Sequence, residues 1–206
     1  MLRSKFVIFA VVVALPLALP SFAQAEWFWY QGNNKLGDET EARAVASTGE
    51  LTMTVNGVVT GPCQISDTGS LWNSATMGEG SIITFTFAAT HAKPCATNFA
   101  GCVAPTITSN ASFATPWSIT LGEATPEEFK TVKLTYHYEG CGKYGIPAKV
   151  EVEGIATSSF NNANSCFEFA KSGDLKVVGG GPAATLSGED CLTFIEGEEE
   201  GGPIGK

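Results

Sequence analysis

The chain has 206 residues, of which 44% are hydrophobic and 16% charged, with 23 glycines and a formal net charge of -9. This composition is that of a globular protein, and it excludes a disordered or collagen-like chain. The acidic charge also argues against a nucleic-acid-binding protein, because phosphate contacts need lysine and arginine.

The first 25 residues have the pattern of a secretory signal peptide. Arg3 and Lys5 precede an apolar run over residues 6–20, and Ala23-Gln24-Ala25 has the small-x-small form of a cleavage site. The run is too short to span a bilayer, which takes about 20 apolar residues. We therefore expect a secreted, extracellular protein without membrane insertion. Its parts are a signal peptide over residues 1–25, a single β domain over 26–195 and a disordered acidic tail over 196–206.

Four consecutive aromatic residues, Trp27 to Tyr30, begin the predicted domain. Successive side chains of a strand point to opposite faces, so we expect two of the four to enter the core and two to face outward or cover an edge. One interpretation is a first strand that closes the end of the domain. The other is an exposed aromatic platform that stacks on sugar rings or on a partner protein. Under the second interpretation, the candidate ligand-binding residues are Trp27, Trp29, Tyr30 and, in a Gly/Ser-rich loop, Trp72.

Alternating apolar and polar residues predict strands along the rest of the domain. Leu51 to Val55 alternates, Asn56-Gly57 fits a type I′ turn, and Val58 to Thr60 leads back as the second strand of a hairpin. The segment 125–128, Thr-Pro-Glu-Glu, favours one connecting helical turn. Further strands are predicted at 83–87, 117–121, 132–138, 150–152, 166–169, 175–178 and 191–195. About nine to ten strands between turns predict an all-β fold, either an antiparallel β-sandwich or a partly open barrel.

All six cysteines follow the predicted signal peptide, so three disulfides are expected in an oxidising compartment. No cysteine pair has the short gap of a zinc clip, and we expect neither a metal nor another cofactor. Sequence alone cannot select one pairing among the 15 that six cysteines allow. A short loop between the second and third cysteines, and two neighbouring strands at the last two, favour Cys95–Cys102, Cys63–Cys141 and Cys166–Cys191.

The sequence offers no assembled set of catalytic residues. His137 shares the polar phase of its strand with Lys133 and Thr135, and His91 lies in a loop without a local partner. Neither histidine is placed to activate a nucleophile. A glycosidase would need a pair of carboxylates, and the available candidates are Glu139, Glu151, Glu153 and Asp174.

Several motifs follow one another along nearly the whole domain. They are the aromatic start with Gly-Asn (29–34), Gly49 to Met53, Val59 to Cys63, Phe87 leading to Cys95 and Cys102, Pro116 to Leu121, a valine-rich strand reaching Cys141, and Ser172 to Leu175. This order resembles uncharacterised secreted all-β, cysteine-containing proteins of soil bacteria, for which no activity is known. Cys166 and Cys191 are additions to that pattern, which is a further reason to pair them. The stretch 58–63 is also similar to the first cysteine strand of bacterial pilins, which are exported β-sandwiches.

These features favour a secreted or cell-surface, non-enzymatic binding or structural domain over an enzyme. A cell-wall glycan and a surface protein are the candidate partners. The alternative is a secreted hydrolase of polysaccharide or peptide, suggested by export and by the spare carboxylates.

Overall fold

The computed structural model describes residues 27–55, 57–90, 92–122, 127–195 and 204–206, without the side chains of 171–173. These residues form strands and two 3-10 turns, and no α-helix is present among them. The strands are β1 (Tyr30–Gln31), β2 (Asn34–Lys35), β3 (Arg43–Val55), β4 (Val58–Asn73), β5 (Gly78–Phe87), β6 (Cys95–Ala96), β7 (Val103–Ser109), β8 (Trp117–Thr120), β9 (Glu127–Glu139), β10 (Lys149–Asn161), β11 (Cys166–Val177), β12 (Ala183–Phe194) and β13 (Ile204–Gly205), and the turns are η1 (Glu39–Glu41) and η2 (Gly142–Tyr144).

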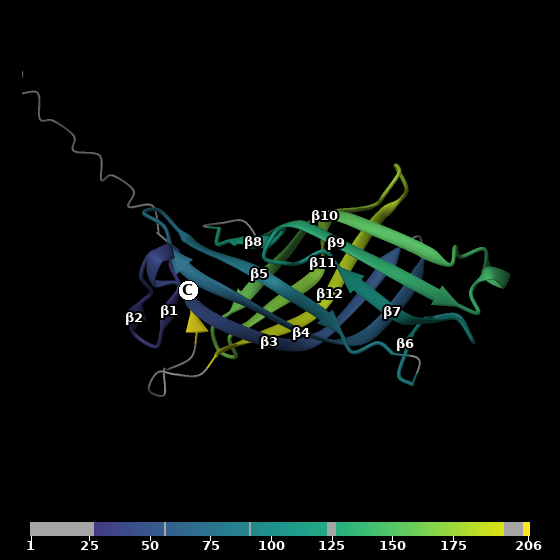
Figure 1. The fold of residues 1–206 in the computed structure, drawn as a ribbon, viewed down its shortest axis with the longest axis horizontal. Coiled ribbons are helices and arrows are strands. Elements are labelled where there is room, and N and C mark those ends of the chain that lie inside the picture. Colours follow the sequence, from purple (N-terminus) through teal and green to yellow (C-terminus); the bar gives the residue numbers. More distant parts are fainter. Residues whose placement is uncertain (1–26, 56, 91, 123–126, 196–203) are drawn as a thin grey trace, which may run out of the picture.

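Eight strands close into an antiparallel barrel, with the remaining strands outside it (Figure 1). The barrel strands follow one another around the wall in chain order, β3, β4, β5, β8, β9, β10, β11 and β12. The last then pairs with the first, from Ala184 opposite Val55 to Phe194 opposite Val45. The all-β prediction is confirmed, whereas the sandwich or partly open barrel is corrected to a closed barrel. Alternation reveals which side chains face inward, but it does not reveal whether the first and last edges meet.

The predicted hairpin at residues 51–60 is confirmed. Val55 and Val58 are register partners, and Gly57 has a φ of 80° in the turn between β3 and β4. The predicted strands at 166–169 and 175–178 are one strand, β11, whose pairing shifts register within its middle part. The predicted helical turn is wrong at Glu127 and Glu128, which begin β9, while residues 125–126 lie outside the described residues.

Three disulfides join the described cysteines, and only one of the three predicted pairings is correct. The β6–β7 hairpin lies between β4 and β9, and each of its cysteines bonds to the wall strand or turn on its own side rather than across the hairpin. The predicted pairs Cys95–Cys102 and Cys63–Cys141 are therefore wrong. Each bond stabilises the fold by about 2–4 kcal/mol, chiefly by restricting the unfolded chain. The observed bonds are Cys63–Cys95, Cys102–Cys141 and Cys166–Cys191.

One end of the barrel is plugged by the segment around β1 and β2, which lies beside the chain end marked C in Figure 1. β13 pairs with β1, and Ile204 is only 2% exposed. The prediction of a disordered acidic tail is therefore wrong for residues 204–206. Residues 196–203 and the predicted signal peptide lie outside the described residues.

Candidate functional site

The four aromatic residues at the start of the domain divide into two buried and two half-buried side chains. Trp29 is 0% exposed and Phe28 only 4%, whereas Trp27 and Tyr30 keep part of their surface. Phe28 and Trp29 are neighbours in the chain, and both are buried because they precede β1 instead of alternating along a strand. Trp29 belongs to the core of the barrel, whereas Phe28 lies under the Lys35 ammonium. Trp72 lies half-buried on the outer face of β4, between the inward-facing Leu71 and Asn73.

Trp29 is the centre of the plug. Its ring packs edge-on against Phe160 and Phe167, with centroids 5.2 and 6.0 Å away. Buried Asn73 holds its backbone in place: the Trp29 amide donates to Asn73 Oδ1 at 2.7 Å, and Asn73 Nδ2 donates to the Trp29 and Leu36 carbonyls. This enclosure leaves Trp29 no surface for stacking on a ligand, so among the predicted aromatics only Trp27, Tyr30 and Trp72 reach the outside.

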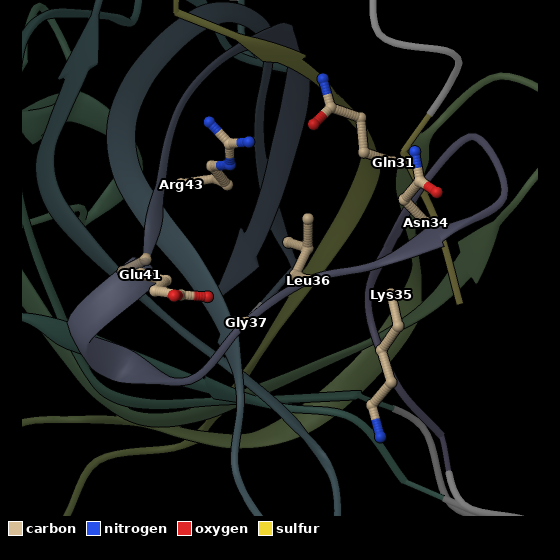
Figure 2. A pocket seen from close by; sticks show the side chains of 8 residues that line it. Gln31, Asn34, Lys35, Leu36, Gly37, Glu41 and Arg43 are labelled. Carbon is tan, nitrogen blue, oxygen red and sulfur yellow. The ribbon is translucent and has the colours of Figure 1, made fainter.

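Beside the plug lies an open hollow of about 560 Å³ between the β1–β2 hairpin, η1 and the start of β3. Figure 2 shows the Arg43 and Gln31 side chains reaching toward the same space, with Leu36 at its base. Glu41 borders this space on the far side from Asn34, and Lys35 extends away from it. The Lys35 ammonium instead lies 2.9 Å from the centroid of the Phe28 ring. The hollow thus offers amide and charged groups around a small apolar floor.

A second polar cluster lies inside the barrel. Asp67 on β4, Asp190 on β12 and Ser47 on β3, the strand between them, are each only 2% exposed. Outside this cluster, none of the described groups hydrogen-bonds to either oxygen of Asp67, to Asp190 Oδ1 or to Ser47 Oγ. Two carboxyl groups in a dry interior cannot both ionise, so the pair holds a shared proton.

The pKa values of the pair follow from this environment. Burial raises the pKa of Asp67 well above its ordinary range, and the neighbouring Asp190 carboxyl raises it further. Burial also raises the pKa of Asp190, while hydrogen bonds with Asp67 and Ser47 act in the opposite direction. The pKa of Asp67 is therefore raised the more strongly of the two, and Asp67 is the group that keeps a proton to higher pH.

The space beside the pair is small. An enclosed cavity of about 10 Å³ borders Asp67 and Asp190, and its other lining side chains are all apolar, Phe85, Trp117 and Phe129 among them. A cavity of this size holds about one water molecule. A substrate has no room beside the two carboxyl groups in this arrangement.

The other candidates for chemistry lie apart from both sites. His137 is exposed on β9, as its phase predicted, and His91 lies outside the described residues. Glu151 lies on the outer face of the barrel wall with Lys133 and Lys149, whose ammonium groups form ion pairs with its carboxylate. Hydrogen bonding and charge from Lys149 lower the pKa of Glu151. Glu139, Glu153 and Asp174 are exposed as well.

Sequence reasoning missed the buried acids, although a signal was present. Asp67 shares the inward phase of Cys63, Ile65 and Leu71, and Asp190 shares that of Leu192. An acidic residue in the apolar phase of a strand predicts a buried carboxyl group, and two of them predict that these groups meet inside.

Metal-ligating side chains gather at one place in the described part of the chain, at Cys166, Glu189 and Cys191. The two cysteines are joined as a disulfide, so no thiolate is available to bind a metal there.

Comparisons with family models, with curated proteins and with solved structures find no match to this chain. The described residues include no helix long and apolar enough to cross a membrane.

Proposed function

We propose that the protein is an exported, non-enzymatic binding domain that takes a glycan in the hollow beside the plug. The observation that carries this proposal is the hollow itself, about 560 Å³ in volume and lined by polar side chains from four successive elements of the chain. Ligand pockets in proteins commonly measure about 300–1,000 Å³. The volume suits a short stretch of sugar rings.

The side chains around the hollow suit the chemistry of sugars. Gln31 and Asn34 carry amides, which both donate and accept hydrogen bonds and so match neighbouring sugar hydroxyls. Glu41 accepts hydrogen bonds from hydroxyl groups, and the guanidinium of Arg43 carries several N–H donors.

Binding is favoured over catalysis because a ligand can enter the hollow but cannot reach the buried acid pair. The hollow is open, whereas Asp67 and Asp190 are enclosed beside a cavity of about 10 Å³. Three disulfides are compatible with an oxidising, extracellular compartment, where a cell-wall glycan would be met.

The test is calorimetric titration with neutral and acidic wall oligosaccharides. In the double variant Gln31→Ala, Asn34→Ala, loss of the two amides should weaken binding at least about tenfold, since each hydrogen bond contributes about 1 kcal/mol. The matched control is Gln64→Ala, an exposed glutamine on β4 away from the hollow, which should bind like the wild type. The proposal fails if no wall oligosaccharide binds, or if the double variant and the control bind equally well.

A hydrolase is the second candidate, and its carboxyl groups would be Asp67 and Asp190, which a substrate could reach only if the barrel wall opened. Paired carboxyl groups with different pKa values can act as general acid and base. Release of reducing sugars from wall polysaccharide by the wild type, and its loss in Asp67→Asn and Asp190→Asn, would replace the binding proposal with this one.

A further inference from the structure

The last three residues of the chain occupy a shaped site on the plug. Tyr30 and Gln31 of β1 pair with Gly205 and Ile204 of β13, so the segment is added as a strand to the β1–β2 hairpin. The Ile204 side chain is buried among the core residues. A short added strand with one anchored apolar residue is a common mode of peptide recognition.

Polar side chains of the barrel fix the backbone of this segment. Asn162, in the turn between β10 and β11, accepts a hydrogen bond from the Lys206 amide at 2.8 Å. Ser165, in the same turn, donates to the Ile204 carbonyl at 2.9 Å. The backbone of this segment is thus hydrogen-bonded on both sides, by β1 on one side and by the turn between β10 and β11 on the other.

An acidic pocket receives the lysine. Glu127 of β9 is 0% exposed, and its Oε1 is paired with the Lys206 ammonium, while its Oε2 finds no partner among the described residues. The same ammonium lies 5.0 Å from the centroid of the Trp27 ring, within the range of a cation–π contact. A buried carboxylate is costly without a cation, so Glu127 specifies a positively charged residue at this position.

The middle position of the segment is less restricted. A methyl group built on Gly205 would meet Asn162 Oδ1 at 3.6 Å, an ordinary contact distance. The site therefore selects an apolar residue at the first position and a lysine at the third, and it accepts glycine or alanine between them.

We infer that this end of the barrel is a binding site for a peptide strand with the pattern apolar–small–lysine, which residues 204–206 fill in the structure. A tethered segment has an effective concentration of about millimolar, so a partner's strand competes poorly until the chain's own segment leaves. This site adjoins the hollow, since Gln31 pairs with Ile204 through its backbone and also lines the hollow, but the inference does not depend on the proposed glycan.

The experiment uses the full chain with Ile204→Asp and Lys206→Glu, which removes the apolar anchor and places a like charge beside Glu127. A fluorescent peptide with the sequence of residues 201–206 is added, and binding is followed by anisotropy. The double variant should bind the peptide at least tenfold more tightly than the wild type does. The control variant Phe113→Asp, at an exposed loop residue, should behave like the wild type.

Three further changes test whether the site recognises the pattern apolar–small–lysine. A peptide with methionine in place of the lysine should lose at least tenfold in affinity, whereas one with alanine in place of the glycine should bind unchanged. Adding Glu127→Gln to the double variant should remove the preference for lysine over methionine. The inference is overturned if the double variant does not bind the peptide while its circular dichroism matches the wild type. It is also overturned if the lysine and methionine peptides bind equally.

If the double variant does not fold, the test moves to the wild-type chain with Glu127→Gln alone. Faster amide hydrogen exchange at Gly205 than in the wild type is then expected, and unchanged exchange there contradicts the inference.

Discussion

Asp67 and Asp190 place two acidic groups in an apolar interior, where one proton is kept between them. The ordinary effect of folding on an aspartate is to lower its pKa through a cationic or hydrogen-bonding partner. Here the dominant cause is burial, and the direction is opposite. The folded chain therefore holds a proton at pH values at which the unfolded chain has already released it.

This reversal predicts that the pair makes the protein less stable as pH rises. The contribution is complete below the unfolded pKa of about 3.9 and is lost progressively up to the raised pKa of Asp67, at no more than about 1.4 kcal/mol per pH unit. Asp67→Asn keeps a donor for Asp190 but cannot ionise. Urea unfolding at several pH values between 4.5 and 8 should show a smaller decline of the unfolding free energy in this variant.

The matched control is Asp174→Asn, an exposed aspartate on β11, which should decline with pH as the wild type does. Carboxylates on the outer face such as Glu151 are the same in all three proteins, so their effects cancel in the comparison. Equal pH slopes in the wild type and in Asp67→Asn would show that the pair does not share a proton.

For single residues, the sequence predicts the burial of some side chains well and the location of others not at all. The outward phase of His137 follows from local pattern. The four aromatics do divide into two buried and two half-buried residues, but the buried two are neighbours in the chain, which strand alternation does not predict. The hollow does not follow from local pattern, because Gln31 and Arg43 belong to different elements and meet only through the plug. Under the interpretation of an aromatic binding platform, Trp29 is a candidate ligand-binding residue, but in the structure it is the buried centre of the plug.

The β3–β4 hairpin shows how far local chemistry decides an element. Gly57 has a left-handed φ of 80°, and no atom lies within 4 Å of a methyl group placed on it. A substitution there tests backbone conformation alone, without a packing effect.

We expect Gly57→Ala to lower the unfolding free energy by about 1–2 kcal/mol, the cost of a left-handed conformation for a residue with a Cβ atom. Gly142→Ala in η2 is the control, since it also has open space around it but no left-handed φ. It should be neutral or stabilise by about 0.4–1 kcal/mol. Denaturant unfolding distinguishes the two, and equal effects would contradict the argument.

Elements with a regular alternation were predicted from the sequence, and those set by long-range pairing were not. The strands at 83–87, 117–121 and 132–138 lie within or largely within β5, β8 and β9. β13 was missed because an Ile-Gly pair carries no strand pattern of its own and gains its structure from β1. The disulfides of the β6–β7 hairpin were mispaired because proximity in the chain does not show which strands flank the hairpin.

For the whole molecule, closure is the property that the sequence does not show. The β12–β3 pairing joins residues near opposite ends of the domain and removes both edges of the wall. An open sheet with the same alternating strands would have an identical pattern of apolar residues. The difference lies in strand number and tilt, which no single segment encodes.

The pairing of β1 with β13 brings both ends of the described chain to one side of the barrel (Figure 1). The backbone is therefore almost a continuous loop, and its starting point can be moved. A circular permutant that links residue 206 to residue 27 through a short glycine linker, and begins at the exposed Gly180 between β11 and β12, should fold to the same barrel.

Its circular dichroism and disulfide map should match those of the parent chain. A second permutant opened between Ser66 and Asp67, within β4, interrupts the wall and should not fold. If both permutants fold equally well, the wall does not depend on an unbroken β4. With its ends joined, the backbone forms a closed ring, so synthesis could begin at a different strand and still produce the same barrel.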